Sequence, residues 1–181
     1  ERDIYASYIN EQFLSGLEQR PEEIVYQFSY AAEPLPYETG SRVTQKSIGQ
    51  LAEMIGRHPG LHFQCNVASQ HANQSLCTMC RELPNFSLTA YWWHNFFPSI
   101  IEQIMAERLD MLPVNKQVGF FSDAYCLEWV YAKMIVVRKC LANVLAARIE
   151  TGQYTQADAL EIAHEILYNS PQALLRFEPY A

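Results

Sequence analysis

Two kinds of hydrophobic pattern alternate along this chain. Four short segments are rich in β-branched and aromatic residues, and each follows a proline or a Pro-Gly pair that breaks the preceding element. This pattern is typical of short, mostly buried strands. The predicted strands are Glu23–Tyr30, Leu61–Val67, Phe86–Trp92 and Val118–Ser122.

Between these strands, apolar residues recur at helical spacing. The longest such segment carries an apolar stripe made of Leu127, Val130, Met134, Val137, Leu141 and Leu145. Gly152 just beyond it is typical of a helix stop, and Pro98 suits the first turn of another helix. The predicted helices are Ile4–Leu17, Ser41–Arg57, Ala72–Leu83, Pro98–Leu112, Leu127–Glu150 and Thr155–Asn169, the last ending before Pro171.

Strands that alternate with helices about every thirty residues indicate β/α units joined by crossovers, and therefore a parallel sheet. No linker-like stretch divides the chain, so we expect one α/β domain over residues 1–181.

Composition narrows the possible functions. Hydrophobic residues make up 49% of the chain and charged residues 18%, enough for one sizeable core. The formal net charge of -7 argues against nucleic acid as a partner. No apolar run approaches the ~18 residues that span a bilayer, which argues against a membrane partner. Five cysteines without framework spacing favour a reducing cytoplasm.

Polar residues gather where the predicted strands end, and in parallel α/β folds ligands bind at the carboxyl ends of strands. We therefore expect four polar sets to face one another above the sheet. The sets are Ser29 and Glu33; Asn66, Ser69, Gln70 and His71; Trp92, Trp93, His94 and Asn95; and Ser122 and Asp123.

Asp123 is the sharpest single candidate. A carboxylate that closes the last strand can bind a metal or accept a proton from a substrate. The alternative is that Ser122 or Asp123 caps a helix that begins near Ala124.

The stretch from Trp92 to Asn95 suits a sugar site, because aromatic rings stack on the CH faces of sugars while His94 and Asn95 bind hydroxyls. We expect one of the two tryptophans to be buried in the core and the other to face the site. Cys77 and Cys80 have the spacing of half a zinc site, but without a second pair we expect them to be core-facing thiols.

The late strands resemble those of uronate isomerase, a (β/α)8 barrel of the amidohydrolase superfamily. The similarity is carried by Leu61–Gln64, by the Trp-Trp-x-Asn stretch in Ala90–Asn95 and by the Gly-x-x-Ser-Asp stretch in Val118–Asp123. The tail is also similar, in Glu150–Gln153 and Ile166–Pro171. The resemblance implies that the chain is the C-terminal half of a TIM barrel with extra C-terminal helices.

The family interconverts an aldo-hexuronate and its keto isomer, such as glucuronate and fructuronate, often with a divalent metal such as zinc. By resemblance, Asp123 would serve as metal ligand or proton-transfer base. Trp92, Trp93, His94, Asn95 and Tyr125 would line the substrate site. The expected partners are a sugar acid and further copies of the chain in a homo-oligomer.

The sequence departs from the family at several positions. Tyr125 stands where the family has an arginine that holds the uronate carboxylate, and Ser29 lies near the place of a histidine. The His-x-His pair of the family's first strand is not in these 181 residues. Four strands also leave two sheet edges open, so we expect a piece of a longer chain rather than a half-barrel that pairs with a second copy.

These departures leave other functions open. A catalytically impaired sugar-binding or regulatory relative would have lost the arginine clamp and the metal histidines. A superfamily hydrolase acting on a neutral or lactone-like substrate is a weaker third possibility. Kinship of fold alone does not choose among them.

Overall fold

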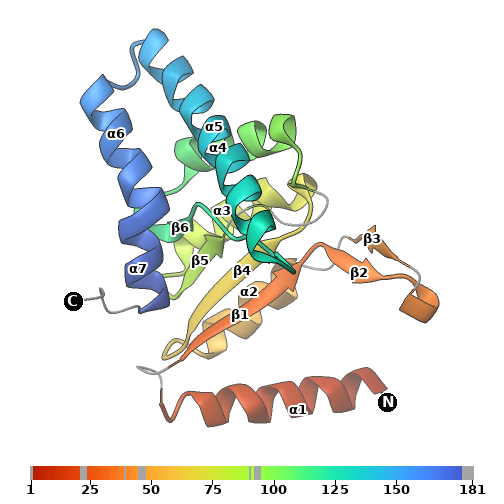
Figure 1. The fold of residues 1–181 in the computed structure, drawn as a ribbon. Coiled ribbons are helices and arrows are strands. Elements are labelled where there is room, and N and C mark those ends of the chain that lie inside the picture. Colours follow the sequence, from red (N-terminus) through yellow and green to blue (C-terminus); the bar gives the residue numbers. More distant parts are fainter. Residues whose placement is uncertain are drawn as a thin grey trace.

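The structure is a computed structural model that describes residues 2–20, 24–38, 40–44, 48–89, 91 and 95–176 (Figure 1). The strands are β1 (Val25–Tyr30), β2 (Ala32–Pro34), β3 (Ser41–Val43), β4 (His62–Val67), β5 (Phe86–Thr89) and β6 (Gln117–Val118). The helices are α1 (Arg2–Leu17), α2 (Ile48–Arg57), α3 (Asn73–Glu82), α4 (Pro98–Met111), α5 (Leu127–Glu150), α6 (Gln156–His164) and α7 (Ser170–Leu175).

The main sheet has the order β1-β4-β5-β6, and every pairing in it is parallel. Strand order in space therefore follows chain order, as expected for successive β/α units. The predicted parallel α/β architecture is confirmed.

The two faces of this sheet differ because side chains alternate along each strand. One face is apolar and packs under α1, α2 and α3, which bury Leu14, Ile55 and Leu76. A second apolar cluster joins α4, α5 and α6. The opposite face of the sheet is polar: its residues are Gln27, Ser29, His62, Gln64, Asn66, Ser87 and Thr89.

The segment after β1 differs from the prediction. Ser41–Val43 is not the start of a helix but a strand, paired antiparallel with Ala32–Pro34 in a hairpin that projects from the end of β1 (Figure 1). The helix begins only at Ile48. Gly40 lies at a φ of 158°, and the amide of Leu35 donates to its carbonyl at 2.8 Å within the turn of the hairpin.

Two later boundaries also differ. The fourth strand of the main sheet ends at Val118 rather than Ser122, because the amide of Gly119 donates to the carbonyl of Ile166 at 3.0 Å instead of to a neighbouring strand. The last helical region does not stop before Pro171. A π-helical turn, Glu165–Asn169, leads into α7, where Pro171 lies in the first turn and its missing N–H costs no helical bond.

The predicted apolar stripe of α5 is buried only in part. Val137, Leu141 and Leu145 are buried against α4 and α6, but Leu127 is 81% exposed. The stripe was therefore wrong for the first turns of this helix, which lie ahead of the stretch that α4 and α6 cover. No helix in the described ranges is long and apolar enough to cross a membrane.

Gly119 permits the close approach of the C-terminal helices to β6. A Cβ at this position would overlap the Cγ2 of Ile166 and lie 3.0 Å from its carbonyl oxygen. The glycine in the Gly-x-x-Ser-Asp stretch is therefore explained by packing.

We predict that Gly119→Ala lowers the free energy of unfolding by about 1–3 kcal/mol, because overpacking displaces Ile166. Gly16→Ala is the matched control: a Cβ there meets nothing within 4 Å, and helix propensity should add about 0.5–1 kcal/mol. Urea denaturation followed by circular dichroism measures both. Equal stability of the two variants would contradict the close contact at Gly119.

Candidate functional site

Three polar residues form a row across the carboxyl ends of neighbouring strands. Ser29 pairs in register with Asn66, and Asn66 pairs with Thr89. Asn66 is only 8% exposed, and its Oδ1 has no hydrogen-bond partner among the described residues. A buried carbonyl oxygen without a donor costs free energy. This row can therefore accept a hydrogen bond from a ligand hydroxyl.

The residues of the layer beneath this row bond mainly to one another, although Gln64 Nε2 has no partner among the described residues. Gln27 Nε2 donates to Gln64 Oε1, and His62 Nε2 lies 3.0 Å from the hydroxyl of Ser87. Burial lowers the pKa of His62, with repulsion from Arg176 and Lys116 adding to the effect. This layer therefore closes the floor of the site, and the row above it is the part offered to a ligand.

Asn95 holds the loop between β5 and α4 against β4. Its side chain is 1% exposed, and its Nδ2 donates to the carbonyl of Val67 at 2.9 Å. Its Oδ1 has no partner within the described part of the chain. Trp92, Trp93 and His94 lie outside the described residues, so their role in sugar binding stays a prediction.

Asp123 follows β6 in a left-handed backbone conformation with a φ of 45°, which aspartate tolerates better than most residues. Its side chain is exposed. The capping alternative is wrong: α5 begins at Leu127 with Cys126 at the N-cap, and no side chain caps it. Asp123 therefore lies in the loop after β6 and does not serve as a helix cap.

Lys133 reaches back from α5 to the Asp123 turn, a contact that the sequence did not predict. Its Nζ donates to the carbonyls of Ser122 and Asp123 at 2.6 and 3.2 Å. The same Nζ lies 5.2 Å from the ring centre of Phe96 and 5.7 Å from that of Trp129. The lysine thus connects the loops that follow β5 and β6.

Tyr125 is 87% exposed just before α5, and its ring meets Trp129 edge-on at 5.9 Å. Nothing in the described contacts holds its hydroxyl, so its assignment to substrate binding stays a prediction. His71 is also exposed and lies just ahead of α3. With Tyr30, Thr44 and Ser69 it borders a polar pocket of about 280 Å³.

Cys77 and Cys80 face the core, as predicted. Both are buried, and desolvation raises the pKa of Cys77 to about 11 and of Cys80 to about 12. Thiols held protonated in this way are poor metal ligands and poor nucleophiles.

The described residues do not build a metal site by themselves. No group of three or more His, Cys, Asp or Glu side chains comes together within the ranges that the structure describes. For a metal ion bound by Asp123, further ligands would have to come from residues beyond those described.

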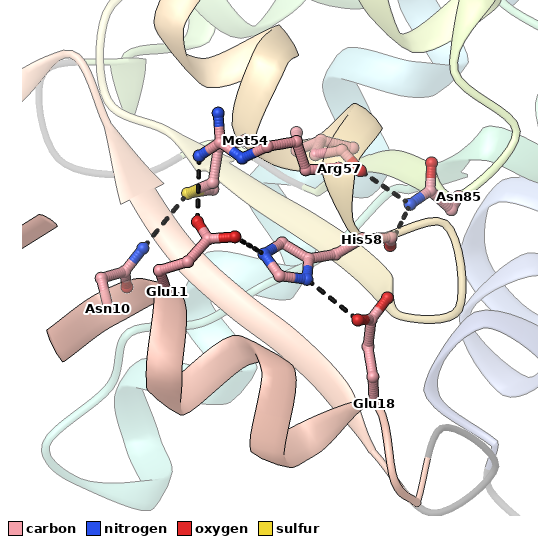
Figure 2. Close-up of polar contacts among 8 residues, drawn as sticks. Asn10, Glu11, Glu18, Met54, Arg57, His58 and Asn85 are labelled. Atoms are coloured by element: carbon pink, nitrogen blue, oxygen red, sulfur yellow. Dashed lines mark hydrogen bonds and ion pairs between the residues drawn. The ribbon is translucent and has the colours of Figure 1, made fainter. Parts of the chain in front are cut away.

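A second polar cluster lies at the opposite edge, near the amino ends of the strands (Figure 2). His58 is 2% exposed between two carboxylates: Nε2 lies 3.2 Å from Glu11 Oε1, and Nδ1 lies 3.1 Å from Glu18 Oε2. Arg57 donates to Glu11 at 3.0 Å, and this hydrogen bond lowers the pKa of the Glu11 carboxyl. Asn85 Nδ2 donates to the carbonyl of His58 at 3.0 Å.

These contacts join α1, the end of α2 and the turn before β5. In barrels of this type the amino-end face serves stability, whereas chemistry lies at the carboxyl end. The cluster therefore fastens α1 rather than forming a second reaction centre.

No family model matches the sequence. Among curated proteins, the uronate isomerase of Thermotoga maritima is 26% identical over 100 residues, which are 55% of this chain and 22% of that protein. The uronate isomerase of Thermotoga neapolitana is 25% identical with the same shares.

Solved structures extend the similarity in fold to nearly the whole chain. The uronate isomerase structure from Thermotoga maritima has a TM-score of 0.85 at 21% identity, covering 94% of this chain and 40% of that one. The one from Bacillus halodurans has a TM-score of 0.78 at 18% identity, covering 92% and 41%. Glucuronate isomerase from Caulobacter crescentus has a TM-score of 0.72 at 16% identity, covering 80% and 31%.

The chain is similar in sequence to uronate isomerases and shares their fold. It matches the C-terminal half of the TIM-barrel-like uronate isomerase fold, and it spans less than half the length of the solved family members. The predicted resemblance to uronate isomerases and the predicted fold class are confirmed.

Part of the strand-end edge could be found from sequence and part could not. Ser29 and Asn66 were marked because polar residues end a buried strand, and the structure brings them together. Thr89 was hidden inside a predicted strand that continued to Trp92. Lys133 lies ten positions beyond Asp123 on a helix, and no spacing rule connects the two.

We predict that His58→Ala lowers the free energy of unfolding by about 2–3 kcal/mol, because two carboxylate contacts and a buried ring are lost. Backbone amides of α1 should exchange hydrogen faster in this variant. His71→Ala, at an exposed histidine, is the control and should stay within about 0.5 kcal/mol of the wild type. Unchanged stability and α1 protection in His58→Ala would contradict the fastening role.

Proposed function

We propose that this chain is the C-terminal half of an enzyme that interconverts an aldo-hexuronate and its keto isomer, of the glucuronate and fructuronate type. The observation that carries the proposal is the row of Ser29, Asn66 and Thr89 at the carboxyl edge of a uronate-isomerase-like sheet. The Oδ1 atoms of Asn66 and Asn95 have no partner among the described residues, and such acceptors suit the hydroxyls of a sugar.

The reaction moves one hydrogen from C2 to C1 and needs no redox partner. In our proposal Asp123 removes the proton from C2, and the released electron pair forms a C1–C2 double bond while O1 takes up a proton. The resulting enediol loses its O2 proton, and Asp123 returns its proton to C1 to give the ketose. A single carboxylate can serve both half-reactions, because it regains its starting state.

Substrate positioning falls to the neighbouring loops. We assign Trp92 and Trp93 to stacking on the sugar, and His94, Asn95 and Tyr125 to polar contacts with it. Asn66 would hold a hydroxyl from below. Oriented binding of this kind contributes much of the rate in proton-transfer enzymes.

A divalent metal ion such as zinc is a further part of the proposal, with Asp123 as one ligand. When bound, such an ion polarises a carbonyl oxygen. Because no set of three ligands comes together in the described ranges, other ligands would lie outside them. The proton transfers assigned above are carried by Asp123 alone.

The organisation of the protein is proposed on similar grounds. We take residues 1–181 as one domain, a half-barrel whose outer strands β1 and β6 would pair with further strands. We propose a cytoplasmic location, which the free and buried thiols of Cys65, Cys77 and Cys80 support. Assembly into a homo-oligomer is an expectation from the resemblance.

We predict that Asp123→Asn lowers kcat for glucuronate at least ~100-fold while KM changes little, because a general base is lost but the hydroxyl contacts remain. The assay follows ketose formation in the protein with every segment its gene encodes. Asp110→Asn, a surface carboxylate on α4 paired with Arg148, is the control and should leave turnover unchanged.

Full turnover in Asp123→Asn would remove Asp123 from the reaction. Saturable sugar binding without any turnover in the wild type would instead favour a binding or regulatory relative.

A further inference from the structure

We propose that Lys133 is the residue that binds the carboxylate of the sugar acid and so selects a uronate over a neutral sugar. The inference rests on the proposed function and names a specificity determinant for the same site. Lys133 is on α5, outside every motif that the sequence singled out.

The Lys133 ammonium is fixed in place at the strand-end edge. Two of its three N–H donors go to the carbonyls of Ser122 and Asp123 at 2.6 and 3.2 Å. One donor therefore remains for an acceptor outside these two contacts. Ordering a flexible lysine side chain costs entropy, and this cost weakens most exposed lysine contacts. The two carbonyl contacts already order the Lys133 side chain, so a ligand that binds it causes little further loss of entropy.

Aromatic rings flank the same ammonium. Phe96 and Trp129 lie 5.2 and 5.7 Å from Nζ, within the range of cation–π attraction. The side chain is half-buried. Less water around a charge strengthens its interaction with a carboxylate.

The position of Phe96 places the ammonium at the junction of three strand ends. Phe96 is next to Asn95, whose side chain is bonded to the carbonyl of Val67, the last residue of β4. Ser122 and Asp123 follow β6. Lys133 thus touches the β5–α4 and β6–α5 loops, beside the turn that carries the proposed base.

The positive charge of Lys133 contrasts with the negative net charge of the chain. The formal net charge is -7, so a sugar carboxylate needs a local positive group to enter. Arg42, on the hairpin beyond β1, is paired with Glu33 at 3.3 Å. The Lys133 contacts are instead with uncharged carbonyls and rings, so its charge is not neutralised by these partners.

The test measures binding of D-glucuronate and of its methyl ester, a neutral analogue, by calorimetry in the full protein. Lys133→Met should weaken glucuronate binding roughly 10- to 100-fold, the loss expected for one charge-assisted contact, and leave ester binding within about threefold. Lys133→Arg should restore the preference for glucuronate. Lys139→Met removes an equal charge from an exposed position on the same helix and should change neither affinity.

Loss of both affinities to the same extent in Lys133→Met would overturn the proposal, because it would show a purely structural role. Unchanged glucuronate affinity in that variant, or a wild type that does not prefer glucuronate to the ester, would overturn it as well. If circular dichroism shows that Lys133→Met fails to fold, Lys133→Gln takes its place with the same expected results.

Turnover assays separate this inference from the isomerase proposal. Selective binding without turnover in the wild type would leave Lys133 in its role and remove the isomerase function. Normal turnover with no change of glucuronate affinity in Lys133→Met would do the reverse.

Discussion

The parallel register of β1, β4 and β5 is the constraint on which the rest of the structure depends. Because side chains alternate along each strand, this register puts Phe63 and Phe86 into the helix-covered core and Asn66 and Thr89 on the other face. A slip of one residue would exchange the two faces and bury the wrong set. The apolar core and the polar row are thus two results of one pairing.

The two edges of the sheet have different roles: the amino edge contributes to stability, and the carboxyl edge carries the candidate binding site. At the amino edge, His58 contacts both Glu11 and Glu18 and so fastens α1 to the end of α2 (Figure 2). At the carboxyl edge, Asn66 and Asn95 keep acceptor oxygens without partners among the described residues. Unsatisfied buried groups are tolerated where a ligand can complete them.

Sequence reasoning succeeded where one periodicity dominates a long segment. The bounds of α5 were predicted without error, and those of α3 and α4 within one residue. It failed where tertiary contacts overrule local pattern: Ser41–Val43 becomes a strand by pairing with Ala32–Pro34, and Gly119 leaves the sheet to bond Ile166. The first turns of α5 carry apolar residues that no described element covers. Their helical spacing therefore predicted the helix correctly but not the burial of these side chains.

The position of the candidate site could be predicted from the sequence, but the positively charged residue beside it, Lys133, could not. Polar residues at the ends of buried strands marked Ser29, Asn66 and Asp123, because the β/α topology brings such ends to one edge. Lys133 reaches that edge only through a long side chain that folds back from a helix. Cys126, not Ser122 or Asp123, takes the N-cap of α5.

In the proposed function, a sugar acid binds at the carboxyl edge of this sheet. The most direct test is amide chemical-shift mapping of the isotope-labelled protein during titration with D-glucuronate. We expect the saturable shifts to gather at Ser29, Asn66, Thr89 and Asp123 and to leave the amides of His58 and Asn85 unchanged. Shifts confined to the His58 edge, or no saturable shifts at the strand ends, would contradict it.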